Sequence, residues 1–149
     1  MDIKQQVYDI VGACMEVHRE LHPGLQEVVY QETLMYELQD KGIPFEREVR
    51  LPIQYKGHTL DKYYQMDFVC YGDIILELKA ANAFTDEHRF QLFTYLRLTK
   101  KPVGLLINFG EKSLHTERYV YDAATGKIEG FNKLDKEAIN KSFNKKIVL

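Results

Sequence analysis

The sequence is poor in residues that mark several large classes of protein. Among its 149 residues there are no tryptophans, two cysteines and four prolines. Two isolated cysteines, Cys14 and Cys70, provide neither a disulfide framework nor a zinc site, and each falls within an apolar pattern. We therefore expect both to be small residues of the core.

Long apolar runs and a strong net charge are also absent. The sequence contains no run of about 18 apolar residues, the length that is needed to cross a membrane. The first residues also lack the apolar segment of a signal peptide, so we expect a cytoplasmic protein. The formal net charge of −2 excludes the overall basicity of proteins that bind nucleic acid mainly by neutralising phosphates. Lysines gather in residues 133–146, which we interpret as a solvated helix and tail in preference to a nucleic-acid arm.

The remaining composition fits one folded domain, residues 1–149. A hydrophobic fraction of 45% and a charged fraction of 28% are typical of globular proteins. Helical periodicity predicts three helices, over residues 4–21, 25–41 and 85–98, and a weaker one over 134–145. Strand patterns predict strands over 45–55, 59–70, 73–80, 103–109 and 117–121, with 103–109 in the interior of the sheet. The expected apolar side of the second helix comprises Leu25, Val28, Val29, Leu34 and Leu38.

Charged residues with chemical potential lie on the strands 59–70 and 73–80. Side chains alternate along a strand, so Glu77 and Lys79 share one face. If the hairpin register places Cys70 opposite Ile74, Asp67 falls opposite Glu77, with the two Cβ atoms about 4.5–5.5 Å apart. Opposed carboxylates destabilise a sheet unless a cation or a shared proton offsets their repulsion. Because magnesium prefers such oxygen ligands, the pair suggests a metal-dependent phosphodiesterase site.

Two alternatives to this interpretation follow from the same residues. Asp67, Glu77 and Lys79 also fit an exposed patch of ion pairs, and a tighter turn would place Asp67 opposite Leu78, on the wrong face. The first register is favoured because it gathers the apolar side chains of both strands on one face, namely Met66, Phe68, Cys70, Ile74, Leu76 and Leu78.

The order of helix, three antiparallel strands, helix and strand, with Asp67 and Glu77-x-Lys79 on the second and third strands, resembles the PD-(D/E)XK nuclease superfamily. Residues 24–30 match the motif of the GxxExxY family within that superfamily. The resemblance implies an α/β (α+β) fold with a restriction-endonuclease-like αβββαβ core, in which helices flank a mixed central sheet. The family-like core would cover about residues 7–121 and be followed by a C-terminal extension.

This resemblance also implies roles for individual residues. It implies a nuclease that hydrolyses phosphodiester bonds with Mg2+ or Mn2+. The implied metal ligands are Asp67, Glu77, the backbone carbonyl of Leu78, and Glu27, which corresponds to an acidic residue of the first core helix. Lys79 and Gln91 would orient the attacking water, and Gln91 would also contact the substrate. A solvated glutamate at position 27 and an ordinary surface glutamine at position 91 are the alternatives.

The substrate and its remaining contacts are less constrained by the sequence. His88 and Tyr30 are weaker candidates for substrate binding, and structural roles are the alternatives for both. DNA is favoured over RNA as the substrate, and a protein partner is a candidate means of targeting. The alternative function is a catalytically silent module of the same fold that binds nucleic acid or a protein partner.

Overall fold

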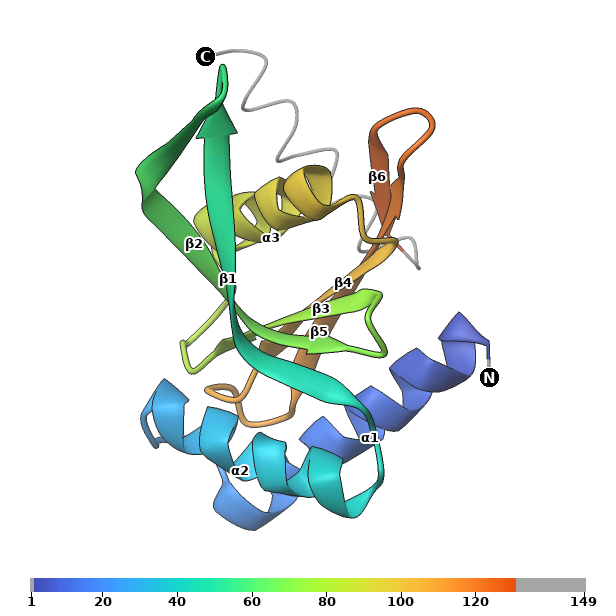
Figure 1. The fold of residues 1–149 in the computed structure, drawn as a ribbon. Coiled ribbons are helices and arrows are strands. Elements are labelled where there is room, and N and C mark those ends of the chain that lie inside the picture. Colours follow the sequence, from blue (N-terminus) through green and yellow to red (C-terminus); the bar gives the residue numbers. More distant parts are fainter. Residues whose placement is uncertain (1, 131–149) are drawn as a thin grey trace.

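The computed structural model describes residues 2–130, which form a mixed six-stranded sheet with helices on both of its faces (Figure 1). Along the chain the elements are α1 (Ile3–Leu21), α2 (Glu27–Asp40), β1 (Phe45–Tyr55), β2 (His58–Cys70), β3 (Ile74–Lys79), α3 (Asp86–Thr99), β4 (Val103–Asn108), β5 (His115–Asp122) and β6 (Lys127–Gly130). The strands lie side by side in sequence order, and all neighbours are antiparallel except β3 and β4, which are parallel. This arrangement confirms the expected α+β fold.

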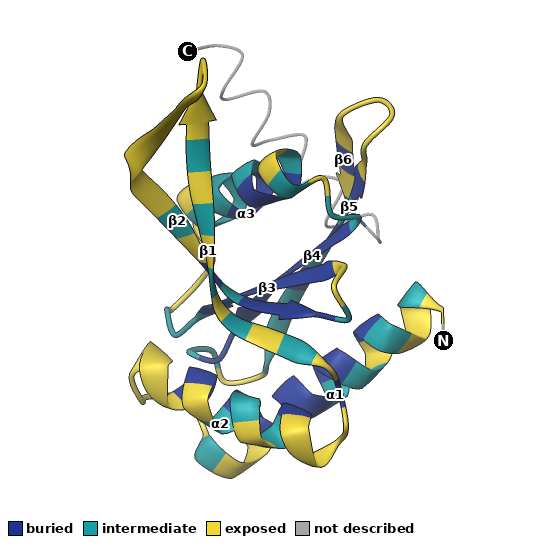
Figure 2. Ribbon diagram, viewed as in Figure 1, coloured by how far each residue is buried: buried dark blue, intermediate teal, exposed yellow. Residues whose placement is uncertain are grey.

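Two cores form because the central strands are apolar on both faces. α1 and α2 cover one face, where Val17 and Leu38 belong to the same buried cluster as Leu76. α3 covers the opposite face, where Leu92 joins a second cluster with Ile75. Accordingly, β3 and β4 are buried along almost their whole length (Figure 2). The interior position predicted for 103–109 is confirmed.

Most of the predicted elements are found within one or two residues of their expected bounds. Thr85 caps α3, since its side chain accepts a hydrogen bond from the backbone N–H of His88. Cys14 and Cys70 are both free and buried, which confirms their expected place in the core. The sequence pattern does not predict strand β6, because four residues are too short for a clear alternation. The helix predicted over 134–145 lies outside the described residues.

The predicted apolar side of α2 is partly wrong. Leu34 and Leu38 are buried as expected, but three other members of the set are exposed: Leu25, Val28 and Val29. The buried row instead runs through Tyr30, four residues before Leu34, and the Tyr30 ring stacks on Phe109 with 4.8 Å between ring centroids. Burial of the large Tyr30 ring directs its side of α2 toward the sheet and leaves Val28 and Val29 on the exposed side. Leu25 is outside the helix, which begins at Glu27.

A second correction concerns Met66, which the sequence pattern places on the same apolar face as Phe68. Phe68 packs against α1 and α2, whereas Met66 belongs to the cluster beneath α3. Across from these residues, Glu48 has a φ of 54° and separates the paired positions Arg47 and Val49. β1 and β2 twist out of the plane of the sheet beyond this level (Figure 1), and the twist accompanies the change by which Met66 faces α3 while Phe68 faces α1 and α2.

No helix among residues 2–130 is long and apolar enough to span a membrane.

Candidate active site

The two carboxylates predicted to face each other do so at the point where β2 and β3 separate. Cys70 pairs with Ile74, which confirms the predicted register. Where the backbone ladder ends, the backbone N–H of Asp67 donates to Glu77 Oε1 at 3.0 Å, and the N–H of Leu78 donates to Asp67 Oδ2 at 2.8 Å. At this position side-chain oxygens accept the hydrogen bonds that backbone carbonyls accept elsewhere in the ladder. These two hydrogen bonds fix both carboxylates where the strands begin to separate.

Burial makes this pair electrostatically unfavourable. Only 3% of the surface of Glu77 is exposed, and burial raises the pKa of its carboxyl well above the ordinary value, with the charge of Asp67 raising it further. Burial also raises the pKa of Asp67, against the lowering effects of the Leu78 N–H and of the positive charge of Lys79. Such a pair favours a bound cation or a retained proton, because either one relieves the repulsion.

Lys79 follows Glu77 on the same side of β3 and connects the pair to α3. Its Nζ donates a hydrogen bond to Gln91 Oε1 at 3.3 Å, across the space between sheet and helix. The positive charge of Lys79 lowers the pKa of Glu77, which places the ammonium group within electrostatic range of the carboxylates. The four residues Asp67, Glu77, Lys79 and Gln91 are thus brought together from three elements.

Glu27 approaches the pair from the first turn of α2. The residue is exposed, yet the surrounding protein desolvates its carboxyl enough to raise the pKa, with Lys79 lowering it and Asp67 raising it. The carboxyl of Glu27 therefore lies within electrostatic range of Lys79 and Asp67. Gln31, one turn further along α2, is buried and donates from Nε2 to Asp67 Oδ1 at 3.1 Å. Arg47 in turn donates two hydrogen bonds to the Gln31 side-chain oxygen.

Gln31 contacts the candidate site through Asp67, and the sequence interpretation missed it. A signal for it exists, since Gln31 stands four residues after Glu27 and so shares its helix face. Asn108, also missed, is a fully buried polar residue at the end of an otherwise apolar strand, where it pairs with Lys79 across the parallel ladder. Its side chain bonds both backbone groups of Ala81 and so fixes the chain just beyond Lys79.

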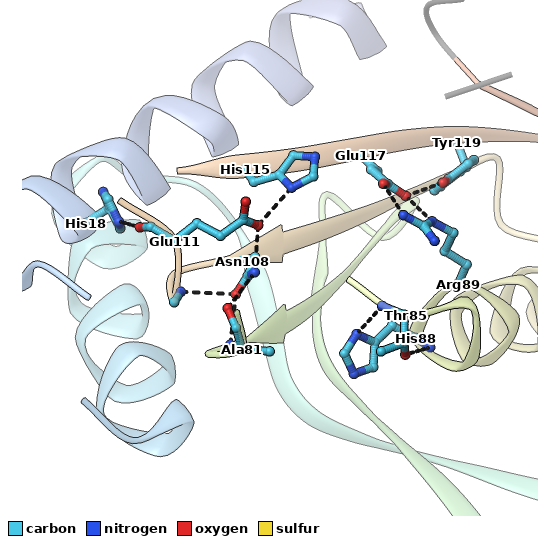
Figure 3. A network of polar contacts seen from close by, with 11 residues as sticks. His18, Ala81, Thr85, His88, Arg89, Asn108, Glu111, His115, Glu117 and Tyr119 are labelled. Carbon is cyan, nitrogen blue, oxygen red and sulfur yellow. Dashed lines mark hydrogen bonds and ion pairs between the residues drawn. The ribbon is translucent and has the colours of Figure 1, made fainter. Parts of the chain in front are cut away.

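A polar network continues from Asn108 to the end of α1 (Figure 3). Asn108 Nδ2 donates to Glu111 Oε2 at 2.8 Å, and the same oxygen accepts from His115 Nδ1 at 2.8 Å. His18, from α1, donates from Nε2 to the Glu111 carbonyl at 2.9 Å. The network ties together the end of β4, the start of β5 and the last turn of α1, and it begins at Asn108, the pairing partner of Lys79.

The two weaker candidates for substrate contact have structural partners. Tyr30 is fully buried, and its hydroxyl donates to the His22 carbonyl at 2.5 Å while accepting from the Leu25 N–H at 3.1 Å. His88 Nδ1 accepts a hydrogen bond from the backbone N–H of Thr85, which completes a reciprocal cap at the start of α3 (Figure 3). Burial and the nearby charge of Lys79 lower the pKa of His88.

The donor chemistry of the pair fits a hard divalent cation in part. Glu77 Oε1 is engaged by Asp67, whereas no hydrogen bond within residues 2–130 engages Glu77 Oε2. Every fully enclosed side-chain oxygen in this part of the chain has a hydrogen-bond partner. Because Glu77 Oε2 has none, it must be accessible to solvent. Within the same residues, no group of three or more His, Cys, Asp and Glu side chains is arranged to hold a metal. The pair thus offers an open carboxylate oxygen, with further ligands required from backbone or water.

Comparisons with known proteins relate this geometry to a family. A comparison with curated proteins gives no match. Among solved structures, the crystal structure of SSO0001 is similar, with a TM-score of 0.51 and 18% sequence identity. The similarity covers 77% of this chain and 56% of that one, and at this identity it concerns the fold alone. Residues 4–119 match the family model of the PD-(D/E)XK nuclease superfamily, and the chain therefore belongs to that superfamily.

Proposed function

We propose that the protein is a metal-dependent nuclease that hydrolyses phosphodiester bonds in DNA. The observation that carries this proposal is the contact between the partly buried Asp67 and the buried Glu77, whose carboxyl groups both have raised pKa values, beside Lys79 in a chain of a nuclease superfamily. Carboxyl groups whose pKa is raised by burial and by a neighbouring charge are common at catalytic sites, where the chemistry requires an altered proton affinity.

Asp67 and Glu77 would hold Mg2+ or Mn2+, with the Leu78 carbonyl and Glu27 as further ligands. When bound, such a cation lowers the pKa of a water molecule and stabilises the charge that develops on the phosphate. Gln31 supports this arrangement because its hydrogen bond to Asp67 Oδ1 orients the carboxylate. Partners of this type commonly set the affinity of a metal site.

Lys79 would orient the attacking water and offset negative charge on the phosphate, and the contact from Gln91 would hold the ammonium group in place. In the reaction, the water oxygen forms a bond to phosphorus and the bond from phosphorus to the 3′ oxygen breaks. One proton leaves the water and another is taken up by the departing 3′ oxygen, so the products carry a 5′-phosphate and a 3′-hydroxyl. Gln91 would also contact a phosphate oxygen.

We further propose that residues 24–30 place the chain in the GxxExxY group of the superfamily. The local geometry gives the motif a physical purpose. Gly24 has a φ of 115°, a conformation that favours glycine, and the Tyr30 hydroxyl ties down the loop through Leu25 and His22. The fixed loop delivers Glu27 as the first residue of α2.

Cleavage assays with matched variants test the proposal. The parent, Lys79→Ala and the surface control Lys127→Ala are incubated with single- and double-stranded DNA and RNA in Mg2+ or Mn2+, and again in EDTA. We expect metal-dependent cleavage of DNA by the parent and the control, and its loss in Lys79→Ala. Equal cleavage by all three proteins would identify a contaminating nuclease and reject the assignment.

The second candidate is a catalytically silent module that binds nucleic acid or a protein partner. It is favoured by the absence, among residues 2–130, of a ready group of three acidic or other ligand side chains. Calorimetry separates the two functions, because an active site should bind Mn2+ in a manner that Asp67→Asn abolishes. A silent module would bind its partner equally well with and without the cation.

A further inference from the structure

The outer parts of β1 and β2, residues 49–64, rise from the sheet as a two-stranded ribbon (Figure 1), which we call the β1–β2 arm. The β2 half of the arm is exposed at every position from 58 to 63, so neither of its faces is covered there (Figure 2). A two-stranded hairpin gains little stability by itself in water. Among residues 2–130, nothing covers positions 58–63 of the arm, so this surface is open to a ligand in the described part of the chain.

The arm differs in charge from the rest of the chain. Residues 49–64 contain three cationic side chains and one acidic one, namely Arg50, Lys56, Lys62 and Asp61. The whole chain, in contrast, carries a net charge of −2. Within the described part of the chain, none of these three cations forms an ion pair. They are therefore free to approach an anionic ligand without breaking an existing pair.

Two exposed tyrosines hold two of these cations against the arm. The Arg50 guanidinium lies over the Tyr63 ring at 4.4 Å from the centroid, and Lys56 Nζ lies 5.4 Å from the centroid of Tyr55. The tyrosines are 40% and 58% exposed, respectively. Contacts between a cation and an aromatic face reduce the freedom of the long side chain while leaving its charge in solvent.

The arm is fixed at its base beside the candidate active site. β2 runs directly from the arm into Asp67, so the two are parts of one strand. Tyr64 contacts Tyr95 of α3 with ring centroids 5.8 Å apart, and the Tyr95 hydroxyl donates to the Gln65 carbonyl at 3.4 Å. Ten residues of chain separate Gly57 from Asp67, so at about 3.3 Å per residue the arm reaches up to about 33 Å from Asp67, close to one turn of a B-DNA helix.

We propose that the β1–β2 arm binds duplex DNA by entering its major groove and contacting the flanking phosphates, about one helical turn from the bond to be cleaved. This inference rests on the proposed nuclease function and specifies its substrate class. The major groove of B-DNA admits a two-stranded ribbon, whereas that of duplex RNA is too narrow and deep. The unpaired cations meet phosphates, which supply most of the affinity of sequence-independent binding.

Salt-dependent binding in EDTA tests the proposal without chemistry. Fluorescence anisotropy is measured on a 20-base-pair DNA duplex for the parent and for the triple variant R50Q/K56Q/K62Q. The control triple variant, K4Q/K100Q/K127Q, removes the same charge from exposed positions elsewhere. Circular dichroism checks that all three proteins fold, and the single variant Lys62→Gln replaces the triple variant if the latter does not.

A plot of the logarithm of the binding constant against the logarithm of the salt concentration has a negative slope. We expect its magnitude to decrease by about 2–3 for the arm variant, or by about 1 for Lys62→Gln, with little change in the control. Arm-dependent affinity should be greater for duplex DNA than for duplex RNA or single-stranded DNA of the same sequence. The proposal is overturned if arm and control variants lose the same affinity, or if the arm effect is equal on duplex RNA or single strands. Arm-dependent binding by a protein that cleaves nothing would reject the nuclease alone, whereas cleavage without arm-dependent binding would reject the arm alone.

Discussion

Replacing Glu77 by glutamine should stabilise the metal-free protein. The substitution keeps an oxygen that can accept the hydrogen bond from the Asp67 N–H, and it removes a buried charge that faces a second carboxylate. The new amide nitrogen takes the position of Oε2, which forms no hydrogen bond within residues 2–130. The change therefore removes an electrostatic cost without creating a packing defect.

The gain should depend on pH in a defined direction. Because the pKa of Glu77 is raised in the folded state, the folded protein binds the proton more tightly than the unfolded chain does. The contribution of Glu77 to the stability of the parent is thus fully present below the unfolded pKa of about 4.3 and is lost as pH rises through the folded pKa. A tenfold difference in proton affinity between the two states corresponds to about 1.4 kcal/mol, so we expect Glu77→Gln to gain about 1–3 kcal/mol at pH 8 and little at pH 4.

Urea unfolding at pH 4, 6 and 8 in EDTA measures this difference. The control is Glu129→Gln on β6, an exposed position on the edge strand opposite β1. For a domain of this size, the predicted gain corresponds to about 2–4 °C of melting temperature per kcal/mol. A variant that is no more stable than the parent at pH 8, or whose gain is the same at pH 4, would refute the reasoning.

Three further predictions follow from the same geometry. Mn2+ at one thousand times its Kd should reverse the order of stabilities, since it adds about 4.1 kcal/mol to the parent and little to a variant that lacks Glu77; an equal gain in both would show that the cation binds elsewhere. Gln31→Ala should weaken Mn2+ binding about 10–100-fold in calorimetry by releasing Asp67, and an unchanged affinity would remove Gln31 from the site. Gly110→Ala should lower the melting temperature, because its Cβ would lie 2.4 Å from the backbone oxygen of Ala81. The control Gly12→Ala, in a helix with open space around the new Cβ, should raise stability by up to about 1 kcal/mol. A loss of stability in both variants would indicate a general effect of the substitution.

The part of the site that lies on adjacent strands could be predicted from sequence. Gly72 marks the connection, and the alternation on either side of it selects a register in which Asp67 faces Glu77. Local spacing therefore determines the contact, because few residues separate the two strands. Lys79 follows by the same period of two.

The parts that depend on distant contacts could not be predicted in the same way. Gln31 and Asn108 reach the candidate site only after α2 and β4 pack against β3. The spacing from Glu27 indicates the helix face of Gln31, but neither residue shows in the sequence which side chain or backbone group it contacts. The position of Met66 in the other core similarly depends on the twist of two paired strands and not on the alternation within one of them. The inward position of Tyr30 depends on a ring contact with a residue far along the chain.

The central claim is that Asp67, Glu77 and Lys79 form a nuclease site, and single-turnover cleavage of a labelled DNA duplex tests it most directly. The rate is measured with excess protein and Mn2+ for the parent and for Lys79→Ala purified in parallel, after both are shown to fold and to bind the cation. We predict cleavage by the parent and a rate roughly 100–1,000-fold lower in the variant, as expected when one electrostatic contact to the transition state is removed. Equal rates in the two proteins, or no cleavage by a parent that binds both Mn2+ and the duplex, would contradict the account.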